Sequence, residues 1–195
     1  NGVMNESPPA SRSVRAALFE GTPGRVHEQI LPRPEPGPGE LLVDVVGCTL
    51  CGSDLHTFEG RRLVAVPTVL GHETVGRIAA LGAAAAPPRD LAGHPLTIGD
   101  RVVWAIVASC GGCGNCQRGL PQKCDRGIKY GHERAVDRRV FTGGLADVCL
   151  LAAGTAVVRL PSDMPLEVAC PASCATATIA AAFEPAGDLV GRTVA

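Results

Sequence analysis

The sequence predicts a mainly β fold, either a compact barrel or a sandwich, followed by a shorter helical segment. From Val14 to about Pro161, short apolar runs rich in β-forming residues alternate with turns that contain Gly and Pro. Many short strands separated by frequent turns are typical of barrels and sandwiches. Near Pro165 the composition becomes rich in alanine, which favours helix. A hydrophobic content of 46% over 195 residues indicates a globular chain with one good core.

The expected strands follow one another in order, each set off by residues that favour turns. The first two, residues 14–19 and 25–31, are separated by Gly21-Thr-Pro-Gly24, and a Pro-rich stretch from 32 to 39 leads into the third at 40–46. The remaining strands are expected at residues 74–81, 101–107, 146–151 and 156–160.

We expect three segments along the chain: a leader, this β region and a helical connector. Residues 1–13 lack the apolar run of a signal sequence and are expected to be a flexible leader or a cloning remnant. Residues 14–165 form the β domain. Residues 166–195 are expected to be a helical connector, with one or two helices over 167–183, ending in the first residues of a further domain that begins a strand at 192–195.

The charge balance and the cysteine count narrow the class of protein. Eighteen basic and 19 acidic residues give a net charge of -1, which leaves no electrostatic footprint for nucleic acid or a membrane surface. No apolar stretch reaches about 18 residues, so no membrane span is expected. Nine unevenly spaced cysteines without a signal peptide indicate metal thiolates and buried thiols in a reducing compartment, which favours the cytoplasm.

Four cysteines lie close together with gaps of two, two and seven residues: Cys110, Cys113, Cys116 and Cys124. A structural zinc ion is held by about four soft ligands at tetrahedral corners. Gly111, Gly112 and Gly114 allow the tight turns that such a wrap requires, because glycine has no Cβ. The alternatives are two disulfides or four buried free thiols, and the spacing favours zinc over both.

A second set of possible metal ligands comes from distant parts of the chain. Cys51, His72 and Cys174 could supply two sulfurs and one imidazole, an attested ligand set for a catalytic zinc with one open position. Asp54 is a natural carboxylate to orient the ring of His72. Taken singly, Cys-x-x-Asp is more often a turn, and Gly-His-Glu is more often a surface loop; together they favour the metal site.

Other residues compete with these assignments. Gly131-His132-Glu133 repeats the tripeptide Gly71-His72-Glu73, but charged neighbours indicate a solvated loop, and a His132 that faces a cleft or a partner is the open alternative. Cys170 competes with Cys174, four residues away and therefore on a similar helix face if the helix continues through Pro171. Cys48 and Cys149 are expected to be small core residues.

At these residues the chain resembles the zinc-containing, medium-chain alcohol dehydrogenase family. The matching elements occur in the family's order over about residues 14–195: Cys51-Gly-Ser-Asp-Leu-His56, Gly71-His72-Glu73-Thr-Val-Gly76, the four-cysteine lobe and Cys174-Ala-Thr-Ala-Thr178. The resemblance implies that residues 14–165 are a GroES-like catalytic barrel and that a Rossmann domain binding NAD or NADP follows.

The resemblance also implies roles for individual residues. Two zinc ions per chain are expected, a catalytic one on Cys51, His72 and Cys174 and a structural one in the four-cysteine lobe. Glu73 would lie behind the catalytic zinc and ligate it transiently. Ser53 is similar to the hydroxyl of the family's proton relay, and His56 to the outer end of that relay.

The sequence departs from the family in two places. Gly52 stands where some members carry an arginine that touches the cofactor phosphates. No Gly-x-Gly-x-x-Gly fingerprint is present, so we expect the chain to be a truncated piece of a longer dehydrogenase. The runs Gly119-Leu-Pro-Gln-Lys-Cys124 and Lys129-Tyr-Gly-His132 also resemble a branch associated with phosphonate catabolism.

The expected function is therefore hydride transfer between an alcohol, aldehyde or ketone and NAD(P), by a protein that forms a homo-oligomer when full length and is inactive as this fragment. Zinc would act as a Lewis acid on the substrate oxygen, and the proton would leave through Ser53 towards His56. The rival hypothesis is a non-catalytic zinc-binding β-barrel used for interaction, which the four-cysteine lobe fits equally well.

Overall fold

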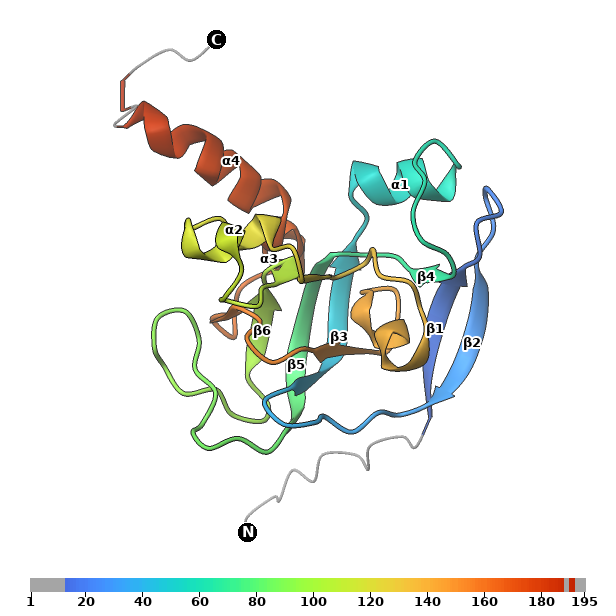
Figure 1. Ribbon diagram of the computed structural model, residues 1–195, viewed down its shortest axis with the longest axis horizontal. Coiled ribbons are helices and arrows are strands. Elements are labelled where there is room, and N and C mark those ends of the chain that lie inside the picture. The colour runs from blue at the N-terminus through green and yellow to red at the C-terminus, as the bar shows by residue number, and fades with distance from the viewer. Residues whose placement is uncertain (1–12, 188–189, 192–195) are drawn as a thin grey trace.

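The chain folds mainly into antiparallel strands, as the sequence predicts (Figure 1). The computed structural model describes residues 13–187 and 190–191. In this part, one sheet has the strand order β2-β1-β4, a second has the order β10-β6-β5-β3-β9, and β7 pairs with β8. The strands are β1 (Ser13–Phe19), β2 (His27–Pro32), β3 (Leu41–Thr49), β4 (Thr68–Val69), β5 (Glu73–Leu81), β6 (Arg101–Trp104), β7 (Val107–Ala108), β8 (Ile128–Lys129), β9 (Val148–Leu151) and β10 (Val157–Arg159).

Short helices connect and follow these strands. The α-helices are α1 (Gly52–Phe58), α2 (Gly114–Gln117), α3 (Leu166–Ala169) and α4 (Ala175–Phe183), and the 3₁₀ helices are η1 (Pro121–Lys123), η2 (Asp137–Thr142), η3 (Cys170–Ser173) and η4 (Glu184–Ala186). Helix is confirmed over the region expected at 167–183. The single strand expected at 101–107 is wrong, because after β6 the chain leaves its partner β10 and pairs with β8 as β7.

Strand β3 has a buried core on each of its faces, because successive side chains of a strand point to opposite sides. Leu41 and Val43 belong to a cluster that includes Ile78, Val102, Trp104 and Leu151. Leu42 belongs to a second cluster that includes Val14, Leu18, Phe141 and Val148. A strand buried on both faces has a strongly specified register, since a slip of one residue would exchange its two faces.

The register of β3 and β5 determines which residues lie at the end of this strand pair. β3 pairs with β5 in antiparallel fashion from Leu41 opposite Leu81 to Thr49 opposite Glu73. The chain leaves β3 just before Cys51 and enters β5 just after His72. Two candidate metal ligands that are far apart in the sequence are therefore delivered to the same end of one strand pair.

The close approach of β3 and β5 depends on Gly76. A Cβ at this position would lie 2.1 Å from Val43 Cγ1 and 2.9 Å from the Asp44 carbonyl oxygen. Gly76 faces Val45 next to a register shift between Val45 and Gly47. Any larger side chain would have to push the two strands apart.

The helical segment after the sheets extends away from them, with α4 projecting from the body of the molecule (Figure 1). In the described residues, no single helix is long and apolar enough to cross a membrane; Leu166–Ser173 and Ala175–Phe183 meet that criterion only when joined across a bend of 62°, on length and composition alone. The leader expected at 1–13 lies outside the described residues except for Ser13, which begins β1. The strand expected at 192–195 also lies outside them, and the domain division near 165 stays a prediction.

Replacing Gly76 with alanine should destabilise the fold by about 1–3 kcal/mol, the usual cost of forcing extra carbon into a packed core. Gly52→Ala is the matched control, because no atom lies within 4 Å of a Cβ at that position. Urea unfolding followed by circular dichroism measures both free energies. Equal stabilities of the two variants would contradict this view of the β3–β5 contact.

Candidate metal centres

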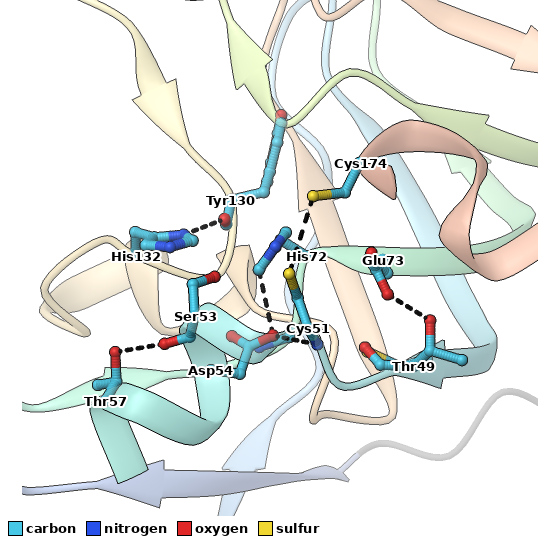
Figure 2. A network of polar contacts seen from close by, with 12 residues as sticks. Thr49, Cys51, Ser53, Asp54, Thr57, His72, Glu73, Tyr130, His132 and Cys174 are labelled. Carbon is cyan, nitrogen blue, oxygen red and sulfur yellow. Dashed lines mark hydrogen bonds and ion pairs between the residues drawn. The ribbon is translucent and has the colours of Figure 1, made fainter. Parts of the chain in front are cut away.

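Cys51, His72 and Cys174 converge on one point, as Figure 2 shows. Cys51 precedes α1, His72 precedes β5, and Cys174 precedes α4. One ligand atom from each lies within 4.8 Å of the other two, and the two sulfurs are 4.0 Å apart. Two sulfurs at tetrahedral corners around zinc, each at about 2.3 Å, would be about 3.8 Å apart. The donor set and its spacing therefore fit a zinc ion held by three protein ligands.

The segment that carries Cys174 is fixed to the strand that carries His72. Ser173 Oγ donates a hydrogen bond to the carbonyl oxygen of His72 at 3.2 Å. Cys170, the competing ligand, is 3% exposed and packs in a core cluster with Val75 and Val103. The two cysteines therefore have different positions: Cys170 anchors η3 to the sheet, and Cys174 lies in the cluster of ligands.

Asp54 stands behind His72 and is buried. Its Oδ2 lies 3.2 Å from His72 Nδ1, within ion-pair range, although Nδ1 has no described partner in good hydrogen-bond geometry. The same carboxylate accepts hydrogen bonds from the backbone amides of Cys51 at 3.0 Å and Gly71 at 3.1 Å. The expected contact between Asp54 and the ring is confirmed, and it leaves Nε2 as the nitrogen available to a metal.

The pKa values of Asp54 and His72 are shifted in opposite directions by the charges around them. Burial alone would raise the pKa of Asp54, but His72 and the two amides outweigh burial and lower it. Burial alone would lower the pKa of His72, but Asp54 and Cys51 outweigh burial and raise it. Burial, the neighbouring Cys51 and Glu73 raise the pKa of Cys174 to about 12. A group of mutually repelling acids around one point favours a bound cation.

The other three residues with expected catalytic roles lie around this centre in different environments. Glu73 is buried and accepts a hydrogen bond from Thr49 Oγ1 at 2.8 Å. Ser53 is half-buried on the first turn of α1, and its side chain points towards the side of His72 on which His132 lies (Figure 2). His56 is exposed in the last turn of α1. Their roles stay predictions.

The four-cysteine lobe forms a second cluster of sulfurs between β7 and β8. One Sγ from each of Cys110, Cys113, Cys116 and Cys124 lies within 4.8 Å of the other three. The Cys113 sulfur is 3.4 Å from that of Cys116 and 3.8 Å from that of Cys124, well beyond the length of a disulfide bond of about 2.05 Å. The arrangement fits one tetrahedral ion and excludes a disulfide between these pairs.

The environment of the lobe also favours thiolates. The Gly112 backbone amide and Cys124 lower the pKa of Cys110 to about 6. Arg126 also approaches that sulfur, with Nη2 at 3.5 Å. The thiolate is the form of cysteine that binds metals, so these contacts favour the ligating form of Cys110, whereas burial and the neighbouring Cys113 and Cys124 raise the pKa of Cys116 to about 11.

The loop that follows the second Gly-His-Glu copy is largely exposed, as expected, but His132 itself packs against His72. His132 is half-buried, and the centre of its ring lies 4.9 Å from that of His72. The cause is Gly131, whose φ of 72° and missing Cβ let it pack on the first copy: a Cβ there would be 2.6 Å from the Gly71 carbonyl oxygen. The glycine that precedes both histidines was the sequence signal for this contact. No local sequence pattern indicated that Ser173 bonds to the carbonyl oxygen of His72.

Comparison with known proteins gives the family. Residues 37–162 match the model of the alcohol dehydrogenase GroES-like domain. The chain is 34% identical over 166 residues to 5-exo-hydroxycamphor dehydrogenase of Pseudomonas putida, an alignment that covers 85% of this chain and 44% of that protein.

Solved structures agree with this match. An alcohol dehydrogenase of Thermotoga maritima superposes with a TM-score of 0.82 and 27% identity, over 90% of this chain and 48% of that one. A zinc-binding dehydrogenase of Sinorhizobium meliloti bound to NADP superposes with a TM-score of 0.61 and 26% identity, over 80% of this chain and 40% of that one. The chain thus spans less than half the length of these relatives.

These findings confirm the GroES-like fold, while the finer resemblance to a branch associated with phosphonate catabolism stays a prediction. The model match covers more than half of the chain, and both sulfur clusters lie where the family resemblance implies ligands. The chain belongs to the zinc-containing, medium-chain alcohol dehydrogenase family as its N-terminal, GroES-like domain.

Proposed function

We propose that this chain is the catalytic domain of a zinc-dependent dehydrogenase that exchanges a hydride between a small alcohol or carbonyl compound and NAD or NADP. In this proposal the chain holds two zinc ions, and a dinucleotide-binding domain outside it holds the cofactor. The whole protein is a cytoplasmic homo-oligomer. The observation that carries the proposal is the convergence of Cys51, His72 and Cys174 from three separate segments on one point.

In this proposal each residue of the site has a separate role. Two sulfurs and one imidazole leave one corner of a tetrahedral set for the substrate oxygen, whereas four protein ligands would close the set. When bound, zinc supplies Lewis acidity that favours the ionised form of a hydroxyl group. Asp54 holds the ring of His72 in a fixed orientation. Ser53 receives the substrate proton, and His56, which is exposed in the last turn of α1, passes it to solvent.

The exposed surface of α4 supports a partner domain beyond the sheets. None of the side chains of this helix is buried, and Ile179 and Phe183 are 57% and 43% exposed. A helix composed almost wholly of alanine and other apolar residues normally packs against something. A dinucleotide-binding domain against α4 would also lie next to Cys174, which directly precedes that helix.

The first test is the metal content of the purified chain. We expect two zinc ions per chain by atomic absorption, falling to one in Cys51→Ser and, separately, to one in Cys124→Ser. In a protein that joins this chain to a dinucleotide-binding domain, Cys51→Ser should lower kcat/KM by about 10³-fold or more, because several kcal/mol of Lewis-acid stabilisation is lost.

The rival, a zinc-binding barrel used only for interaction, makes the opposite prediction. It requires one zinc ion, held by the four-cysteine lobe, and an unchanged zinc content in Cys51→Ser. Cys149→Ser is the control, because Cys149 is buried in the core away from both clusters. A single zinc ion in the wild-type chain would support the rival.

Asp54→Asn should weaken metal binding at the three-ligand site about 10- to 100-fold, the usual cost of losing a partner behind a ligating histidine. Asp54 raises the pKa of His72, and only the neutral ring binds metal. Protons therefore compete with the metal from a higher pH in the wild type than in the variant. The difference in affinity should be widest above the raised pKa of His72 and narrow as the pH falls.

Titration with cobalt, followed by its visible absorption at several pH values, measures this difference. Asp90→Asn is the control, because Asp90 also accepts hydrogen bonds from backbone amides, those of Ala92 and His94, but on a separate loop. A deficit for Asp54→Asn that stays constant with pH would show that the carboxylate does not act through His72.

Chelation should loosen the lobe between Cys110 and Cys124 before the rest of the fold. The lobe has no buried residue in α2 or η1 and therefore depends on its metal, whereas the sheets keep their own cores. Hydrogen exchange after addition of a chelator should show early loss of protection at residues 110–127 only. Simultaneous loss over the lobe and β3 would contradict this order.

A further inference from the structure

Arg62 is a half-buried cation close to the three-ligand centre, on the loop that joins α1 to β4. Its Nη1 lies 2.9 Å from His132 Nε2. Among the described residues, no carboxylate lies within ion-pair distance of this guanidinium. Two acids close to this contact are already engaged: Glu59, three residues before Arg62, pairs with Arg61, and Glu133, next to His132, pairs with Arg139.

His132 fixes the position of this cation next to the metal ligands. His132 Nδ1 lies 2.9 Å from the carbonyl oxygen of Tyr130, which can only accept, so Nδ1 carries the proton. The guanidinium can only donate, so Nε2 of the same ring accepts from it. The ring itself packs against His72. Arg62 is thus tied through a single imidazole to a ligand of the candidate zinc.

The position of the Arg62 guanidinium favours the binding of an anion. Removing a charge from water without an opposite charge is costly, and Arg62 is half-buried with a neutral imidazole but no carboxylate beside it among the described residues. The planar fork of arginine matches the paired oxygens of a carboxylate or phosphate. Figure 2 shows Ser53 on the side of His72 where His132, the partner of Arg62, lies.

We propose that Arg62, oriented by His132, binds an anionic group, a carboxylate or phosphate, of the substrate whose hydroxyl or carbonyl lies at the Cys51–His72–Cys174 centre. This inference rests on the proposed function and adds the substrate class: small alcohols or carbonyl compounds that carry a negative charge. Arg62 binds and positions the substrate, and His132 is a positioning residue that acts through Arg62.

The test uses the zinc-loaded chain and pairs of ligands that differ only in charge. Glycolate, 3-hydroxypropionate and 4-hydroxybutyrate are each compared with the corresponding hydroxy amide by calorimetry. At least one acid should bind about 10- to 100-fold more tightly than its amide, the usual contribution of a charged hydrogen-bonded pair. Arg62→Gln should abolish that preference without changing the zinc content.

Arg61→Gln is the matched control, because it removes the same charge one residue away, from a guanidinium that is exposed and paired with Glu59. The preference for the acid should stay within about twofold of wild type in this variant. Arg62→Lys keeps the charge and should retain part of the preference, so the inference stays testable even if Arg62→Gln folds poorly. His132→Ala should reduce the preference while leaving the zinc content at two.

Several results would overturn the inference. One is a preference for the acid that survives in Arg62→Gln or is lost equally in Arg61→Gln. Weaker binding of ADP-ribose by Arg62→Gln, with the preference for the acid intact, would assign the arginine to the cofactor's phosphates instead. Two zinc ions without any preference for acids in the wild type would overturn this inference alone, whereas a single zinc ion would overturn the proposed function and this inference with it.

Discussion

The candidate catalytic centre depends first on the register of one antiparallel strand pair. Thr49 at the end of β3 faces Glu73 at the start of β5, and this pairing places Cys51 beside His72. The register is held because both faces of β3 are buried and because Gly76 lets the strands approach closely. A slip of one residue would bury the wrong side chains and separate the two ligands.

The third ligand comes from a different kind of structure. Cys174 ends a run of short helices that is anchored to the sheet by the buried Cys170 and by the hydrogen bond from Ser173 to the His72 carbonyl. The centre then gathers thiols and carboxylates around one imidazole, and burial together with repulsion from Cys51 and Glu73 raises the pKa of Cys174. A divalent cation would relieve that repulsion, so the electrostatics of the site and its geometry favour the same occupant.

The sequence predicted most of the strands, the helical segment and the four-cysteine lobe from local patterns: Gly and Pro at turns, alanine in helices, and closely spaced cysteines. It predicted the second cluster only by combining motifs from distant parts of the chain. It favoured Cys174 over the competing Cys170, but the helical relation across Pro171 depends on how η3 packs on the sheet, which the sequence does not show. It left open whether His132 faces solvent or a cleft, because its neighbours are charged and the packing of Gly131 on Gly71 is visible only in the folded chain. The contact between Arg62 and His132 spans 70 residues and follows only from the folded chain.

The proposed function requires a metal ion bound by Cys51, His72 and Cys174. Diffraction from crystals of the zinc-loaded chain, recorded on both sides of the zinc absorption edge, tests this directly. The account predicts two anomalous peaks, one of them at about 2.3 Å from the sulfurs of Cys51 and Cys174 and about 2.0–2.1 Å from a ring nitrogen of His72. A single peak, within the four-cysteine lobe, would contradict it.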